Sequence, residues 1–307
     1  MLKYIGARLS IGVLSLLVVS MVTFSMAFLA GDPAVAIAGR NASASEITNI
    51  RELYGFDRPV VVQYGNWLAK TVTGDLGFSY RYRQPVADMI AKRLPVTMTL
   101  CIASLLLALL LAVPLAIVSA VRSDGIIARI SNFLCVLGQS TPPFWFALVL
   151  IVIFGLNLRV LPISGAGTWL HFVMPTFVLA FFAMPPILRL TQTAMKNALS
   201  ADYIRTARSK GLPAKTVLIR HALRNVLVPL VSVTAFQLGT MLGGSIVVEQ
   251  IFALPGLGAL GFDATLRSDL PLLQAITILI AAVYILLMLC ADCINAAVDP
   301  RLKQSIS

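Results

Sequence analysis

The chain alternates between long apolar stretches without Asp, Glu, Lys or Arg and shorter polar segments that carry most of its charged residues. Six apolar stretches are distinguished by their length: residues 9–30, 96–121, 130–154, 170–188, 227–248 and 272–291. Each has about 20 residues, the number that an α-helix needs to cross the hydrocarbon core of a bilayer. The pattern therefore predicts an all-α integral membrane protein with six transmembrane helices.

The composition agrees with this prediction and limits the possible functions. Of the 307 residues, 58% are hydrophobic and 12% are charged, whereas soluble domains contain roughly 25% charged residues. Much of the formal net charge of +11 comes from short loops beside the apolar stretches, as expected for loops that stay in the cytoplasm. We therefore expect both chain termini in the cytoplasm and no binding of nucleic acid.

The first third of the chain combines a membrane helix with a long polar segment. Residues 9–30 exceed the roughly 7–15 apolar residues of a signal-peptide core and no A-x-A site follows them, so an uncleaved first helix is expected. The polar segment that follows is expected outside, with an amphipathic helix near residues 45–54. We divide the chain into an N-terminal segment with the first helix (residues 1–30), an external segment (31–95) and a core of five helices (96–307). The core contains a cytoplasmic loop (196–226).

A basic stretch, residues 201–229, lies between two apolar ones. Asp202 is its one acidic residue, against Arg205, Arg208, Lys210, Lys215, Arg220 and Arg224. Good helix formers precede Gly211, a residue suited to the left-handed conformation that ends a helix, and Pro213 is suited to the first position of the next helix. The pattern predicts two helices joined by a tight turn, with positive φ at Gly211. Such a pair is suited to contact a partner protein, and the alternative is a solvated loop without a partner.

Two parts of this stretch, DYIRTARSKGL (202–212) and RHALRNVLVP (220–229), carry a family resemblance. They resemble the EAA-type cytoplasmic loop of ABC importer permeases, in the form found in the first permease subunit of the dipeptide, oligopeptide and nickel uptake family. Segments 54–59, 74–79 and 93–95 are similar to that family in order and spacing, so the resemblance covers nearly the whole chain. The general motif opens with Glu-Ala-Ala, which Arg205-Thr206-Ala207 replaces here, as in the peptide branch of the family.

The resemblance implies that the loop forms a coupling helix, which docks into a groove on an ATPase subunit. The residues expected to carry this contact are Tyr203, Arg205, Thr206, Ala207, Lys210 and Gly211. Ala207 is expected to be small because the docked helix lies against the groove there. The chain itself has no Walker A motif, since residues 211–216 only faintly resemble one and Pro213 removes an amide that would bind phosphate. No catalytic residue and no cofactor are expected, and ATP hydrolysis is left to partner subunits.

By the same resemblance, the protein is expected to have the type I ABC importer permease fold and to lie in the bacterial inner membrane. The implied partners are a homologous second permease in a heterodimer, two ATPase subunits, an external solute-binding protein and membrane lipid. The external segment is expected to cover the outer mouth and to help receive the binding protein. Expected substrates are di- or oligopeptides, with nickel or another metal chelate as the alternative. A self-sufficient secondary transporter is the competing class, but four of the spans lack the ionisable residues that ion-coupled carriers usually need.

Four polar residues are candidates for lining the translocation path: Gln139, Ser140, Gln237 and Glu249. The first two precede adjacent prolines, and a broken backbone at membrane depth is tolerated where protein or water receives its freed carbonyl groups. We expect this break to face the protein interior, with a purely structural kink as the alternative.

Two further patterns are assigned to helix packing. Gly239 and Gly243 have the small-xxx-small spacing that permits close helix approach. Cys290 and Cys293 have CxxC spacing, but no second Cys pair or nearby His accompanies them in the sequence, so no metal site is expected.

Overall fold

The computed structural model describes residues 2–29, 32–39 and 42–298, and helices dominate this part of the chain. Five helices are long and apolar enough to cross a membrane. They are α1 (Leu2–Leu29), α5 (Val86–Val121), α8 (Leu170–Ser200), α11 (Leu223–Ile251) and α13 (Leu270–Val298). Two short helical segments, α10 (Ala214–Thr216) and η2 (Val217–Ala222), extend α11 without interruption to Ala214.

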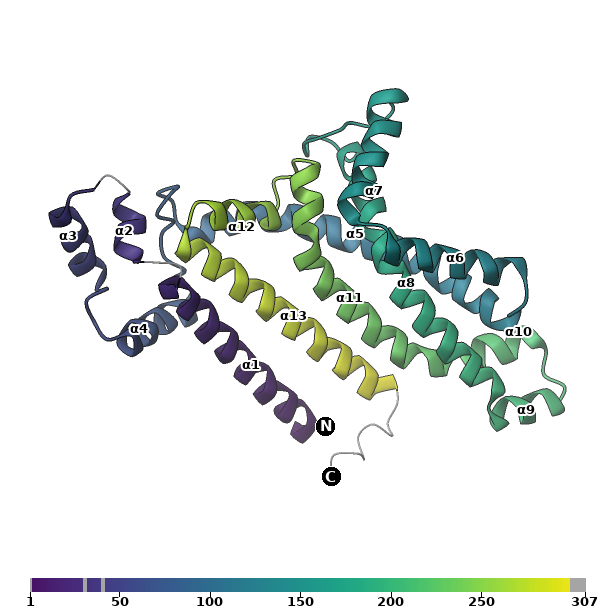
Figure 1. Ribbon diagram of the computed structural model, residues 1–307. Helices are drawn as coiled ribbons and strands as arrows, with labels where there is room; N and C mark the ends of the chain where they lie inside the picture. The colour runs from purple at the N-terminus through teal and green to yellow at the C-terminus, as the bar shows by residue number, and fades with distance from the viewer. Residues whose placement is uncertain (1, 30–31, 40–41, 299–307) are drawn as a thin grey trace.

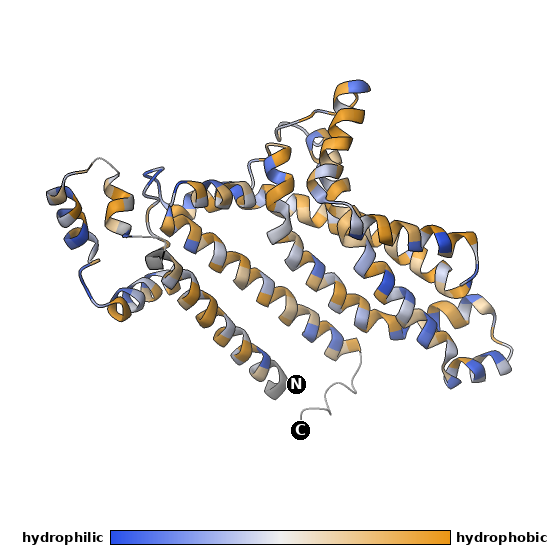
Figure 2. Ribbon diagram, viewed as in Figure 1, coloured by the Kyte–Doolittle hydropathy of each residue, from blue (hydrophilic) through white to orange (hydrophobic). Residues whose placement is uncertain are grey.

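The long helices α1, α13 and α11 lie side by side in a slanted row (Figure 1), and α5 and α8 continue the bundle. The start of α1 and the end of α13 lie together, and Arg8 Nε approaches Asp292 Oδ2 at 3.1 Å. Following the sidedness expected from the sequence, we call the end of the bundle that holds this pair the cytoplasmic end and the opposite one the outer end. Figure 2 shows apolar residues along the length of these helices, as expected for a lipid environment.

The remaining span is broken into two pieces. Its first part, α6 (Ile126–Ser140), is followed by α7 (Pro143–Leu150) and η1 (Ile151–Asn157), and the two parts meet at an angle of 106°. Pro142 and Pro143 lack the amide hydrogens that would continue the helical ladder. The predicted number of six spans is thus confirmed when the bent pair is taken as one span, and α7 rises away from the bundle in Figure 1.

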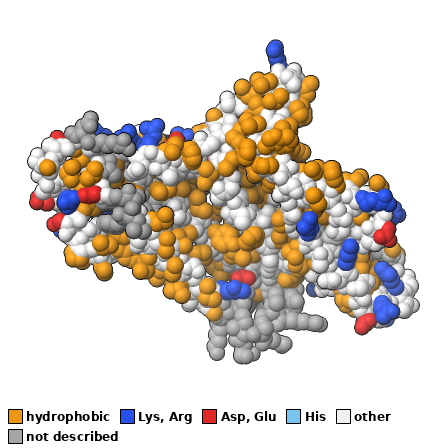
Figure 3. Space-filling view, viewed as in Figure 1, with side chains coloured by type: hydrophobic (Ala, Val, Ile, Leu, Met, Phe, Trp, Pro, Cys, Tyr) orange, Lys and Arg blue, Asp and Glu red, His pale blue; other side chains and the backbone are white. Residues whose placement is uncertain are grey.

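Small side chains allow the central helices to approach closely. Ala108, Ala112 and Ala116 on α5 are buried at four-residue intervals, so they lie on one face of the helix. They belong to the largest buried apolar cluster, which joins α5, α8 and α11. By contrast, large apolar side chains on α1 and α6 are exposed, and Figure 3 shows hydrophobic atoms spread over the surface of the long helices. These surfaces are available for lipid or for another membrane subunit.

Three short helices form the outer segment: α2 (Pro33–Ala38), α3 (Ala44–Tyr54) and α4 (Val60–Val72). The amphipathic helix expected near 45–54 is α3, which begins with a capping box because Ser43 and Glu46 exchange side-chain and backbone hydrogen bonds. The hydroxyl groups of Tyr64 on α4 and Ser20 on α1 lie 2.7 Å apart. The outer segment is therefore attached to the end of the first membrane helix.

A second outer attachment joins the loop before α5 to the turn between α12 (Leu257–Leu266) and α13. The buried Asp269 carboxylate accepts hydrogen bonds from the Ser79 hydroxyl and from the backbone N–H groups of Tyr80 and Arg81, both at 3.3 Å. Three donors satisfy a carboxylate that would otherwise be costly to bury. This contact fixes the loop beside the C-terminal end of α12.

Candidate functional site

The basic stretch at the cytoplasmic end forms the predicted pair of helices. The first is α9 (Asp202–Ser209), and α10 follows after a tight turn. Gly211 has φ of +74°, and its N–H donates to the Arg208 carbonyl at 2.9 Å. The predicted positive φ is therefore confirmed. Pro213 occupies the position just before α10 rather than its first helical position, so the predicted helix start is wrong by one residue.

One face of α9 is built into the chain. Ile204 and Ala207, three residues apart, pack into a buried cluster with Met195, Val217 and Val226. Ala207 is only 6% exposed. The expectation that its side chain lies against a partner is therefore corrected, because the need for a small residue comes from packing inside this chain. Ala207 positions the helix and does not present a contact surface.

The opposite face of α9 is open to solvent. Five of the residues predicted from the sequence are exposed: Tyr203, Arg205 and Thr206 on α9, and Lys210 and Gly211 in the turn that follows it. Tyr203 is 42% exposed, and its hydroxyl accepts a hydrogen bond of 2.8 Å from the Asn225 side-chain amide. The sequence analysis did not assign a role to Asn225. It links the exposed face of α9 to the start of α11 and so fixes the orientation of that face.

The proline break also differs from its prediction. Gln139, Ser140 and both prolines are exposed on the described chain, as are Phe144 and Trp145. The expectation that the break faces the interior of this chain is therefore wrong. The reason is that α6 buries its other face, where a Cβ atom on Gly138 would lie 2.8 Å from Pro185 Cγ of α8.

The two candidates on α11 do not form one site. Gln237 and Glu249 are twelve residues apart, which corresponds to about 18 Å along a helix axis. Gln237 is buried, and its side-chain amide donates to the Ala183 carbonyl of α8 at 3.4 Å. It therefore contributes to contact between two helices of the bundle.

Glu249 is fully buried at the outer end of α11 and joins three helices. Its carboxylate accepts hydrogen bonds of 2.7 Å from the Thr97 hydroxyl of α5 and 2.8 Å from the Ala259 N–H in the first turn of α12. Thr97 in turn accepts from the Leu257 N–H at 2.8 Å. In this conformation Glu249 is a joint between helices, because a carboxylate near a helix N-terminus satisfies free N–H groups.

The bundle of long apolar helices defines the class: the protein is an integral membrane protein. Residues 112–304 match the family described as "Binding-protein-dependent transport system inner membrane component", and residues 1–101 match its N-terminal counterpart. The chain belongs to this family of binding-protein-dependent transport permeases.

Curated relatives match the chain over nearly its whole length. The glutathione transport system permease protein GsiC of Escherichia coli (strain K12) is 37% identical over 304 residues, covering 99% of both chains. The dipeptide transport system permease protein DppB of Lactococcus lactis subsp. cremoris (strain MG1363) is 37% identical over 305 residues, covering 99% of this chain and 100% of the relative.

Solved structures support the fold. The inward-facing MetNI methionine ABC transporter superposes with a TM-score of 0.54 at 19% identity, covering 70% of this chain and 99% of the other. An amino acid ABC transporter with histidines gives a TM-score of 0.50 at 18% identity, covering 70% and 94%. Together with the family match, these findings confirm that the chain is a helical permease subunit of an ABC importer in the bacterial inner membrane. The competing class of self-sufficient transporters is not favoured.

Proposed function

We propose that this chain imports di- or oligopeptides as one half of a heterodimer with a homologous second permease. Its similarity to permeases named for glutathione and for dipeptides, at 37% identity over almost the entire length, is the observation that supports this substrate class. Both named substrates are short peptides. The experiment is uptake of radiolabelled L-alanyl-L-alanine and of nickel by cells with and without this permease. Uptake of nickel alone would refute the peptide proposal.

The surface expected to face the second permease includes the proline break between α6 and α7. A lipid-facing position would leave the backbone groups at this break without partners in hydrocarbon, which is costly. Gln139 and Ser140 are exposed there together with the aromatic residues Phe144 and Trp145. A second subunit or a water-filled path between the subunits would satisfy the freed groups, so this position agrees with a role for the break beside the path.

The exposed face of α9 is proposed to dock onto one of two ATPase subunits. Arg205 and Thr206 lie on this face, the exposed Lys210 follows in the turn, and Tyr203 is held by Asn225. Because the other face is buried in the chain, α9 can transmit force to α8 and α11. The proposed coupling segment is residues 196–226, within the core 96–307.

Adjacent substitutions separate docking from folding. Thr206→Asp places a charge on the exposed face, so we expect normal insertion and permease pairing but loss of ATPase co-purification and uptake. Ala207→Asp buries an unpaired charge, which costs several kcal/mol, so we expect the segment to unfold locally and become protease-sensitive at Lys210. Ser123→Asp, in the exposed turn between α5 and α6 and outside the membrane spans, is the control for an added charge. Undiminished ATPase recovery with Thr206→Asp would refute docking through this face.

The outer segment, residues 31–95, is proposed to receive the solute-binding protein over the outer mouth, following the membrane helix of residues 1–30. Its helices α3 and α4 expose apolar side chains, among them Leu53, Val61 and Val72. Replacing Leu53 and Val61 by Ser should weaken binding-protein affinity of the reconstituted complex without affecting ATPase recovery. Unchanged affinity would argue against this surface.

A further inference from the structure

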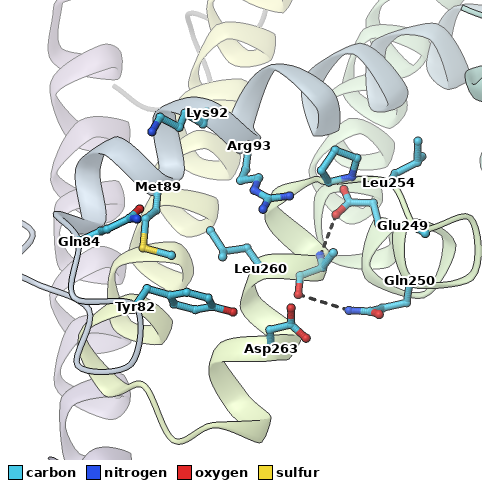
Figure 4. A pocket seen from close by; sticks show the side chains of 13 residues that line it. Tyr82, Gln84, Met89, Lys92, Arg93, Glu249, Gln250, Leu254, Leu260 and Asp263 are labelled. Atoms are coloured by element: carbon cyan, nitrogen blue, oxygen red, sulfur yellow. Dashed lines mark hydrogen bonds between the residues drawn. The ribbon is translucent and has the colours of Figure 1, made fainter. Parts of the chain in front are cut away.

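A cavity of about 480 Å³ opens at the outer end of the bundle, between the first turns of α5, the end of α11 and helix α12. This volume is within the range of pockets that hold small molecules. Figure 4 shows its walls, to which Met89 and Leu260 contribute apolar surface and Tyr82 contributes an aromatic ring. The cavity lies beside the Glu249 joint, so its shape depends on how α5, α11 and α12 are joined.

Two of the polar side chains around the cavity are already occupied. The Glu249 carboxylate accepts hydrogen bonds from Thr97 and Ala259. The Gln250 side-chain amide donates to the Ala259 carbonyl at 3.3 Å. These groups build the wall and leave little capacity for a ligand.

Arg93 and Asp263 are different. Both are partly buried in the cavity wall, Arg93 on α5 and Asp263 on α12. Neither forms an ion pair with any residue that the structure describes. In Figure 4 the guanidinium group of Arg93 and the carboxylate of Asp263 extend into the same space from opposite walls. A cation and an anion held apart across a small cavity are complementary to a ligand that carries both charges.

We propose that this cavity is a binding site for the zwitterionic backbone of a short peptide, an inference that rests on the proposed peptide import. Arg93 binds the terminal carboxylate, because its planar guanidinium group matches carboxylate geometry with two parallel hydrogen bonds. Asp263 binds the terminal ammonium group. The apolar and aromatic walls contact the side chains without selecting among them. The site lies at the outer mouth, so it receives the peptide before the peptide enters the path.

Both charged walls are needed to bind a zwitterionic peptide. The terminal charges of a peptide are strongly hydrated in water, and their transfer toward the bundle is costly unless each finds a partner. The cavity lining carries two cations, Lys92 and Arg93, and two carboxylates, Glu249 and Asp263, so it can compensate both charges of the peptide and adds no net charge beside the path. It therefore recognises peptides by their ends, as a permease for varied peptides requires.

The test uses the assembled permease–ATPase complex in nanodiscs, without the binding protein, and saturation-transfer difference NMR, which detects weak binding. The probes are L-alanyl-L-alanine, its C-terminal amide and its N-acetyl derivative. We expect the wild-type complex to bind the unmodified dipeptide roughly tenfold more tightly than either derivative, because each derivative loses one charge-assisted contact.

The variants locate the contacts. Arg93→Gln should weaken binding of the dipeptide roughly tenfold while leaving the amide unchanged, and Asp263→Asn should do the same while leaving the N-acetyl derivative unchanged. Arg93→Lys should restore part of the affinity. Arg81→Gln and Asp88→Asn are matched controls, because both residues are exposed and do not line the cavity. They should bind all probes as the wild type does.

Other outcomes distinguish failure of the proposed peptide-binding cavity from failure of the proposed peptide import. Equal affinity of wild type and Arg93→Gln for the dipeptide would overturn the site, even if cells import the dipeptide and the peptide proposal stands. Loss of binding-protein association in Arg93→Gln with unchanged dipeptide binding would also overturn it and would assign the cavity to the binding protein. If cells import no dipeptide but the charge-dependent binding is found, the proposed function fails while the site is retained.

Discussion

Gly211 offers a graded test of the turn that orients the coupling segment. Its φ of +74° is in the left-handed region, and a Cβ atom there would find no described atom within 4 Å. A substitution therefore introduces backbone strain without a steric clash. Ala should cost about 1–2 kcal/mol and the β-branched Val more, whereas Asn tolerates this conformation and should cost less. Since 1.4 kcal/mol corresponds to a factor of about ten in an equilibrium constant, Gly211→Ala should lower the equilibrium constant for forming the docking-competent turn roughly tenfold.

The measurement is ATPase co-purification and dipeptide uptake for Gly211→Asn, Gly211→Ala and Gly211→Val at matched expression. ATPase co-purification and dipeptide uptake should both decrease in that order, because they depend on the same turn. Insertion and pairing with the second permease should not change, since no membrane-spanning residue is altered. Equal loss in all three variants would show that the side chain, rather than φ, matters. Full activity of Gly211→Val would refute the role of the turn.

Two further predictions concern packing. Gly239→Ala should lower the free energy of unfolding in SDS by about 1–3 kcal/mol, because its Cβ atom would lie 2.0 Å from Tyr284 Cδ2 of α13. A Cβ atom at Gly243 would have no described atom within 4 Å, so Gly243→Ala should change this free energy by no more than about 0.5 kcal/mol. Equal effects of the two substitutions would contradict this account. Asp269→Leu should expose residues 79–85 to protease, because the Ser79 hydroxyl and two N–H groups lose their acceptor. Each buried donor left without a partner costs about 1–3 kcal/mol. Unchanged protection from protease would count against the attachment.

The hydrophobic pattern predicted the number and order of the membrane helices but not where they end. The stretch 170–188 corresponds to α8, which continues as a helix to Ser200, and 272–291 corresponds to α13, which reaches Val298. Hydropathy reports the residues that can contact lipid, whereas the helix ends where capping and tertiary contacts end it. The additional turns carry α8 from the membrane toward α9, so the omitted part is functionally relevant.

The turn at Gly211 could be predicted because glycine is suited to the left-handed conformation that ends a helix, which is a property of the local sequence. The burial of Ala207 had a weaker local signal: Ile204 and Ala207 are three residues apart on a short, otherwise polar helix, so they share one face. Glu249 had no such signal. Its partner Thr97 is 152 positions away, and only the packing of α5 against α11 and α12 brings the two together. A lone carboxylate near an apolar span is compatible with either a path or a joint.

The helix from Ala214 to Ile251 connects the two sites. It has 38 residues, which corresponds to about 57 Å of continuous helix. At its cytoplasmic end, Val217 and Val226 pack against the buried face of α9. At its outer end, Glu249 is hydrogen-bonded to α5 and α12 beside the charged cavity. Because both ends are tied to their neighbours, a displacement of α9 that moves this helix as a rigid element must also strain or break the hydrogen bonds of the outer joint. The geometry thus links the proposed ATPase surface to the outer mouth through one helix.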